Sequence, residues 1–182
     1  MNDSENIMQG FILPFKERPV LICSENQIFS NKKENLSKFF SVNFKLPYGT
    51  EILASKSGVV VSIVNRLDRY YEGDLKDLDH ILEKDPFLKF PNYISIQHLD
   101  RSISTYSHLD KNSFEVSLGE TVSQGQLIAK TGKSGIIGSF PHLHFEVLNY
   151  QAMPSDLNSE KFIPKFIDYL GNFDILNTHK YF

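Results

Sequence analysis

The feature that most constrains the fold is a series of short segments in which apolar and polar residues alternate. The clearest of these segments are 51–54, 58–64, 93–97, 103–108, 127–130 and 142–148. Alternation with a period of two is typical of a β-strand that buries one of its faces. In the segment 93–97, Ile94 and Ile96 lie on one face and Ser95 lies on the other, as in an antiparallel strand. The chain is therefore expected to be mainly β.

Two glycine-centred turns follow one another in the second half of the chain, at Gly119 and Gly125. Glycine permits the positive φ angle that a tight turn between short strands requires. The spacing of the turns brings three apolar residues onto one core face: Val116, Val122 and Ile128. This pattern favours a two-sheet antiparallel β-sandwich or barrel-sandwich over alternating strands and helices.

One stretch, 66–91, interrupts the strand pattern and is rich in charged residues. A short helical insertion is expected near 74–84, with Asp74 as its N-terminal cap. Three leucines share one face of that helix at helical spacing: Leu75, Leu78 and Leu82. Two interpretations stay open, namely a solvated excursion that packs its leucines on the sheet, and a lid or docking arm.

The length of 182 residues corresponds to one domain, which can bury roughly two thirds of its unfolded surface. We expect N-terminal strands over 1–29 that pack on the domain, a β domain over 30–150 and a C-terminal extension over 151–182. The extension either forms a helix or covers the sheet as an extended segment. The helix is suggested by the spacing of apolar residues and by a proline suited to a first turn: Phe162, Phe166, Leu170 and Pro164.

Composition excludes several classes of function. The chain has 19 Lys and Arg against 22 Asp and Glu, a net charge of −3 without a basic run, which argues against nucleic acid as a partner. The single cysteine excludes an internal disulfide and a cysteine-rich zinc site. No segment approaches the ~20 apolar residues of a transmembrane helix. The acidic N-terminal residues Asp3 and Glu5 do not suit a signal peptide, so the chain as written is expected to be cytoplasmic.

The segment from Pro141 to Val147 carries the most specific chemical signal. Three polar side chains project from one face of the predicted strand: His142, His144 and Glu146. Two imidazoles about 7 Å apart along a strand suit a division of roles. One would hold a metal ion, and the other would serve a proton or oxyanion of the substrate. A second pair, Tyr106 and His108, shares a face of the strand 103–108 and would bring a third imidazole to the same place.

Together these motifs resemble the LytM or lysostaphin-like zinc endopeptidases, which cut the peptide cross-links of bacterial peptidoglycan. The matching pieces occur in the order of the family, over roughly 30–149, and end with Pro141-His142-Leu143-His144-Phe145. The earlier pieces are 47–52, 57–60, 92–98, 106–109, the turns at Gly119 and Gly125, and 132–135. The resemblance implies the duplicated hybrid motif, a two-sheet β fold with an open groove across one sheet. It also implies a periplasmic or extracellular location.

The family holds zinc with an early His, an early Asp and the second His of His-x-His. By this resemblance His144 is a metal ligand, and His108 and His142 are the catalytic pair that acts on the substrate and the zinc-bound water. The two early ligand positions are occupied by Asn31 and Asn43, since no histidine precedes His80. The resemblance places three further residues at the groove, where Phe140 replaces the usual glycine and narrows it: Phe140, Glu146 and Tyr106. Glu146 either orients a neighbouring imidazole or is simply solvated.

These substitutions bear on mechanism, because a neutral amide is a poor zinc donor. Zinc lowers the pKa of bound water to ~7 from 15.7. We therefore expect weak or absent zinc and a degenerate enzyme whose groove binds a peptidoglycan peptide or a protein partner such as a cell-wall hydrolase.

Two other functions stay open. The first is an active metallo-endopeptidase with an unusual ligand set, in which His142 with His144, or Glu146 with another acid, holds the metal. The second is a carrier or phosphotransfer domain of related topology. That class would use Lys133 or the histidine pair, but its surrounding motifs are missing.

Overall fold

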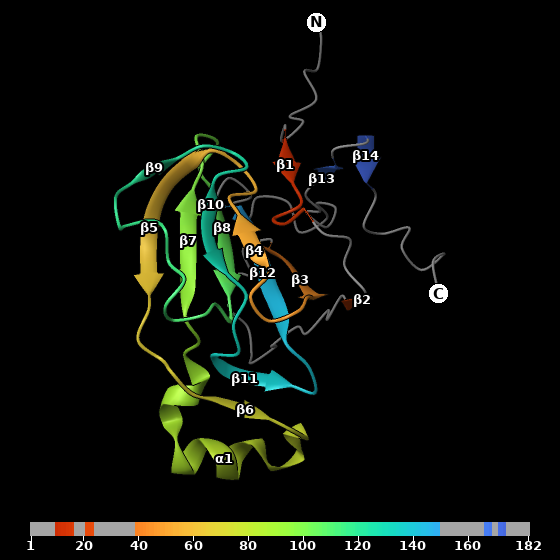
Figure 1. The fold of residues 1–182 in the computed structure, drawn as a ribbon, viewed down its shortest axis with the longest axis vertical. Coiled ribbons are helices and arrows are strands. Elements are labelled where there is room, and N and C mark those ends of the chain that lie inside the picture. Colours follow the sequence, from red (N-terminus) through yellow and green to blue (C-terminus); the bar gives the residue numbers. More distant parts are fainter. Residues whose placement is uncertain (1–9, 17–20, 24–38, 150–165, 169–170, 174–182) are drawn as a thin grey trace, which may run out of the picture.

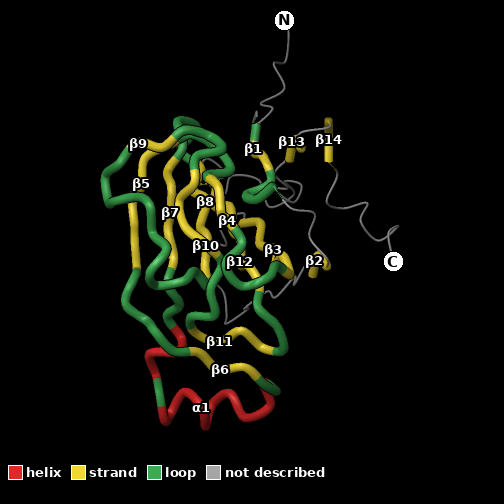
Figure 2. Tube along the Cα trace, in the orientation of Figure 1, coloured by secondary structure: helices red, strands yellow, loops and turns green. Residues whose placement is uncertain are grey.

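The computed structural model describes residues 10–16, 21–23, 39–149, 166–168 and 171–173. Over these residues the protein is mainly β, as the alternation predicts (Figure 1). The strands are β1 (Phe11–Ile12), β2 (Leu21–Cys23), β3 (Phe39–Lys45), β4 (Glu51–Leu53), β5 (Gly58–Val64), β6 (Tyr70–Glu72), β7 (Tyr93–Gln97), β8 (Ser102–Ser107), β9 (Thr121–Val122), β10 (Leu127–Lys130), β11 (Gly135–Gly138), β12 (His142–Asn149), β13 (Phe166–Asp168) and β14 (Gly171–Phe173). The helical elements are η1 (Leu75–Asp77), α1 (Leu78–Lys84) and η2 (Pro86–Lys89), all in the insertion at the bottom of Figure 2.

The main sheet has the strand order β2-β3-β12-β8-β7-β5-β9 over the described residues, and every neighbouring pair is antiparallel. All six predicted strands occur in the structure, to within one residue at each end. The pairing of β7 with β5 and β8 confirms the antiparallel strand expected at Tyr93–Gln97. Ile94 and Ile96 are fully buried. Ser95 on the other face is also mostly buried, and its hydroxyl pairs with that of Thr105.

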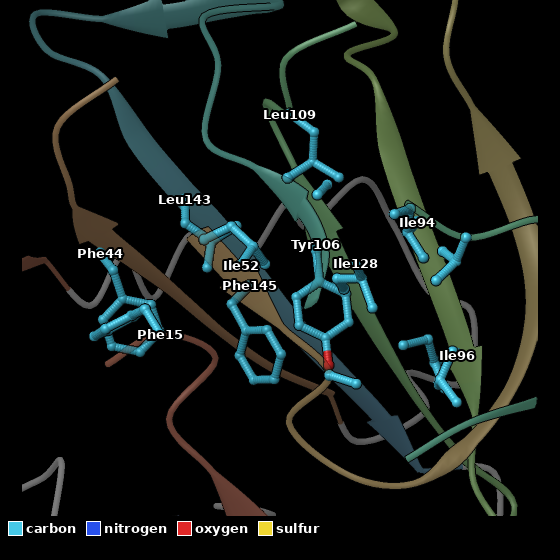
Figure 3. Close-up of a cluster of buried hydrophobic side chains, with 14 of the residues drawn as sticks. Phe15, Phe44, Ile52, Ile94, Ile96, Tyr106, Leu109, Ile128, Leu143 and Phe145 are labelled. Carbon is cyan, nitrogen blue, oxygen red and sulfur yellow. The ribbon is translucent and has the colours of Figure 1, made fainter. Parts of the chain in front are cut away.

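A second, two-stranded sheet of β4 and β10 packs on the apolar side of the main sheet. Figure 3 shows Ile52 and Ile128 from this small sheet among Ile94, Tyr106 and Phe145 of the large one. The three apolar residues around the glycine turns are buried as predicted: Val116, Val122 and Ile128. The core therefore lies between two sheets, and the opposite side of the main sheet is left for polar residues.

The insertion contains the predicted helix. One interpretation expected the leucines of this helix to pack on the sheet, and the structure differs from it. Asp74 caps the 3-10 turn η1 by accepting a hydrogen bond from the backbone N–H of Lys76. No residue of α1 is buried, and Leu75 is 46% exposed. Packing of that leucine on the sheet is therefore a wrong prediction. Burial in the insertion is supplied instead by Leu67 and Leu88, which lie before and after the helix.

The base of the insertion is fixed by Asn92, whose side chain is fully buried. Its Oδ1 accepts hydrogen bonds from the backbone N–H groups of Arg66 and Leu67, at 3.0 and 2.8 Å. Its amide donates to the carbonyl of Leu67 at 2.7 Å and, at 3.3 Å, to that of Leu109. Its own backbone N–H donates to Ser134 Oγ at 3.0 Å. Through its side chain and its backbone N–H, Asn92 thus ties the start of the insertion to the loop that precedes β11.

The segments outside the main domain form a small sheet in which β13 pairs with β14 and, in parallel, with β1. Phe166 lies in β13, so the helical alternative for the C-terminal extension is wrong at that residue. The other residues of that prediction, Phe162, Pro164 and Leu170, lie outside the described residues. Of the helices in the described part of the chain, none has the length and apolarity to cross a membrane.

Candidate functional site

The pairing of β12 with β3 positions the predicted site residues. In this antiparallel register His142 lies opposite Lys45, and His144 lies opposite Asn43. The residues of β12 on the other side are fully buried: Leu143, Phe145 and Val147. Their burial forces the alternate side chains onto the other surface of the sheet. We call this surface the polar face, and its central residues are Asn43, Lys45, His142, His144 and Glu146.

Both ring nitrogens of His144 have side-chain partners. Nε2 lies 2.8 Å from Glu146 Oε1, and Nδ1 lies 2.7 Å from Asn43 Oδ1. An ionised carboxylate only accepts hydrogen bonds, so Nε2 carries a proton and donates it to Glu146. Glu146 therefore fixes the orientation of the ring. Nδ1 faces the amide oxygen of Asn43, which is neutral and is itself a hydrogen-bond acceptor.

His108 reaches the polar face through a break in the strand pattern. The strand β8 ends at Ser107, and His108 adopts a left-handed backbone with φ of 64°. Its ring centroid lies 4.6 Å from that of His142 and 6.2 Å from that of His144. Three imidazoles thus come together, although the alternation that predicted His108 on the same face as Tyr106 does not extend to it.

Burial is the main cause that lowers the pKa of His108 to about 3, and the neighbouring His142 lowers it further. A hydrogen bond to the backbone carbonyl of Ser134, at 2.8 Å, acts in the opposite direction. Because a carbonyl accepts, Nδ1 donates to it and the neutral ring keeps its lone pair on Nε2. His108 at neutral pH is therefore an uncharged ring that can accept a hydrogen bond at Nε2.

Tyr106 does not line the polar face, which corrects the prediction that placed it at the groove. Its side chain is fully buried, and Figure 3 shows it in the core beside Phe145. Its hydroxyl accepts a hydrogen bond from the backbone N–H of Ser55 at 2.7 Å and lies 3.1 Å from Ser104 Oγ. The even-numbered residues of β8 face the core, and Tyr106 follows that alternation.

Phe140 lies against His142, with ring centroids 5.9 Å apart in an edge-to-face arrangement. The Nζ atom of Lys45 lies 5.0 Å from the centroid of the Phe140 ring, a cation–π contact. Sequence reasoning missed Lys45 as a site residue. The signal was present, because Lys45 lies two residues after Asn43 on one strand and so shares its face.

Hydroxyl groups extend the polar face across the neighbouring strands. Ser107 and Thr105 of β8 lie opposite His144 and Glu146 in the register. Thr105 Oγ1 lies 2.9 Å from Ser95 Oγ on β7, and Ser62 Oγ of β5 lies 3.1 Å from the Tyr93 hydroxyl. The face therefore offers hydrogen-bonding groups well beyond the histidines.

A catalytic zinc ion takes three protein ligands and keeps one position open. Within the described ranges no three His, Cys, Asp or Glu side chains are grouped so as to hold a metal ion. Nδ1 of His144 faces the amide of Asn43, and Asn31 lies outside the described residues.

Solved structures that match this chain include a zinc-containing peptidase from Vibrio cholerae, with 29% identity and a TM-score of 0.44 over 64% of this chain and 30% of that one. The catalytic domain of lysostaphin from Staphylococcus simulans has 25% identity and a TM-score of 0.41, over 60% of this chain and 68% of that one. Csd3 from Helicobacter pylori has 19% identity and a TM-score of 0.47, over 85% of this chain and 36% of that one.

The chain thus spans less than a third of the Vibrio peptidase. A search of the curated proteins finds no match. Residues 39–157 match a family described as Peptidase family M23. This match extends over β3 to β12 and includes all three histidines of the polar face, so the chain belongs to peptidase family M23.

Proposed function

We propose that this M23 domain is catalytically silent and uses its polar face to bind a peptide of peptidoglycan or a protein that acts on peptidoglycan. The observation that carries the proposal is the position of Asn43, whose amide stands 2.7 Å from Nδ1 of His144. A carboxylate there would bring a negative charge and a strong donor to a metal ion. An amide of the same shape brings neither.

Weak metal binding removes the source of hydrolytic power in such a site. Zinc lowers the pKa of its bound water to ~7 from 15.7, which makes hydroxide available at neutral pH. His108 stays neutral, and with a pKa of about 3 its ring is too weak a base to produce a comparable nucleophile from water. The histidines then serve as hydrogen-bonding groups on a binding surface.

The composition of the polar face suits a peptide ligand. Peptide bonds offer both donors and acceptors, and the partly buried side chains of Asn43 and Thr105 on this face can also supply both. Lys45 adds a positive charge beside the Phe140 ring. Hydrogen bonds to charged groups are stronger than neutral ones, so Lys45 is expected to contribute most to an acidic or carboxylate-bearing peptide.

One contact favours a second candidate, an active metallo-endopeptidase with an unusual ligand set. Histidines that bind metal commonly donate their other ring N–H to a carboxylate, and His144 does so to Glu146. His142 and His108 lie close enough to contribute further nitrogen donors.

The deciding experiment uses the full chain without a histidine tag. We expect no stoichiometric zinc by mass spectrometry, no cleavage of peptidoglycan or glycine-rich peptides, and co-sedimentation with purified peptidoglycan. Lys45→Ala is expected to weaken this binding several-fold, whereas the exposed helix residue Lys84→Ala, a matched control, leaves it unchanged. A double substitution that restores the family ligands, Asn31→His with Asn43→Asp, is expected to raise zinc content.

Two outcomes would overturn the proposal. Stoichiometric zinc together with turnover that is lost in His144→Ala establishes the second candidate. Absence of any binding to peptidoglycan or to a cell-wall hydrolase removes the binding module.

A further inference from the structure

A pocket of about 230 Å³ lies away from the polar face, at the base of the insertion, and is lined by Arg66, Leu67, Arg69, Phe87 and Phe90. We propose that this pocket binds the free C-terminal carboxylate of a peptide together with the apolar side chain of its last residue. The proposal is independent of the function proposed for the polar face, since the two share no residue.

The apolar part of the pocket is unusual for a surface. Phe87 and Phe90 are 58% and 54% exposed. They are three residues apart at the 3-10 turn η2, and this spacing places side chains on the same side of such a turn. Leu67, almost fully buried, is the third apolar residue of the lining. Exposed apolar surface beside polar groups marks binding sites more often than isolated exposed residues do.

One wall of the pocket is held in place by Arg69. Its Nε and Nη2 atoms donate to the two carboxylate oxygens of Asp85, and its guanidinium lies 5.8 Å from the centroid of the Phe87 ring. Such a two-point pair fixes the orientation of both groups. Because Asp85 neutralises it, Arg69 shapes the pocket without giving it net charge.

Arg66 supplies the charge. Its guanidinium has no ion pair with any residue that the structure describes, whereas the nearby acid Asp68 already contacts Arg69 and Lys111. Its backbone is fixed by the hydrogen bond to Asn92. A guanidinium is always charged and matches a carboxylate with two parallel hydrogen bonds. An unpaired cation beside apolar walls selects a carboxylate that carries an apolar group.

The volume limits the ligand further. Pockets for drug-sized molecules occupy ~300–1,000 Å³, so a pocket of about 230 Å³ has room for little more than one residue. An internal peptide residue has no free carboxylate at its backbone, and a side-chain carboxylate has no apolar side chain beside it. The end of a chain with an apolar last residue supplies both.

The test measures fluorescence anisotropy of short labelled glycine peptides with the full chain. We expect a peptide that ends in leucine with a free carboxylate to bind about tenfold more tightly than the same peptide with a C-terminal amide, a difference of about 1.4 kcal/mol. Arg66→Gln is expected to remove this difference, and Phe90→Ser to weaken binding of both peptides. Arg101→Gln, an exposed arginine outside the pocket, is the matched control and should bind like the unmodified chain.

The proposal is overturned if the acid and the amide bind equally, or if Arg66→Gln keeps the preference for the acid. An amidated peptide ending in glutamate that binds as tightly as the leucine acid would make this a general anion site and would also overturn it. Lys45→Ala separates this site from the polar face, because it should leave the leucine peptide bound.

Discussion

Strand β12 and the insertion both present imidazoles and charged groups on the surface, but they hold these groups in different ways. Beneath β12 the residues Leu143, Phe145 and Val147 are fully buried, so the core sets the direction of each neighbouring polar side chain. Helix α1 has no buried residue. The insertion depends instead on hydrogen bonds at its base, above all those of Asn92. Substitutions on the surface of the sheet should therefore change the free energy of unfolding little, and substitutions in its core should lower it strongly. In the insertion, the loss of single polar contacts should have the larger effect.

The largest expected effect tests the core beneath the polar face. Phe145→Ala should lower the free energy of unfolding by about 3–5 kcal/mol, because it removes a buried ring that contacts Phe44 and Tyr106. In the insertion, Leu78→Ala should cost less than about 1 kcal/mol, since that side chain is only partly buried. Urea unfolding of both variants measures the difference. Equal losses would break the comparison.

The second prediction concerns the base of the insertion. Asn92→Ala leaves the buried N–H group of Leu67 and the partly buried one of Arg66 without their acceptor, at about 1–3 kcal/mol for each unsatisfied buried group. We expect a total loss of about 3 kcal/mol and faster hydrogen exchange at both amides. The exposed neighbour Asn65→Ala serves as the control and should change neither quantity. Unchanged exchange in Asn92→Ala would show that the insertion is held by other contacts.

The third prediction compares an imidazole of each region by pH. The pKa of His108 is about 3 in the folded chain and ~6.5 when unfolded, so between these values the unfolded state binds more protons. Stability should therefore fall as the pH drops below ~6.5, by about 2 kcal/mol at pH 5 from this group. His108→Gln should reduce the slope of stability against pH. His80→Gln on the exposed helix is the control variant. An equal reduction of the slope in both variants would contradict its assignment to His108.

Much of the sheet was predictable from the sequence, because burial on one side imposes the period of two. The strand positions, the buried valines at the glycine turns and the shared face of His142, His144 and Glu146 all follow from that period. The period ceases to apply where the chain leaves the strand. The left-handed backbone at His108 and the resulting direction of its ring depend on contacts with Gly132 and Ser134 that no local pattern encodes.

The insertion was less predictable, since its helix is too short for amphipathic spacing to decide what packs. Leu75, Leu78 and Leu82 have the spacing of one helix face. The leucines that are buried in the insertion are instead Leu67 and Leu88. The pocket joins residues from both ends of the insertion, and only tertiary contacts bring Arg66 beside Phe90. Lys45, by contrast, could have been predicted as a site residue. The alternation along β3 places it on the same face as Asn43, and the register of β3 with β12 places it opposite His142.

The parallel pairing of β6 with β11 has a consequence for the order of assembly. Tyr70 pairs with Gly135, and β7, β8, β9 and β10 lie between them in the chain. The short sheet at the insertion therefore cannot close until the chain has been synthesised through Gly135. An emerging chain can pair β7 with β8 first, and it carries the exposed aromatic turn of Pro86–Lys89 unsupported by β11 until that late step.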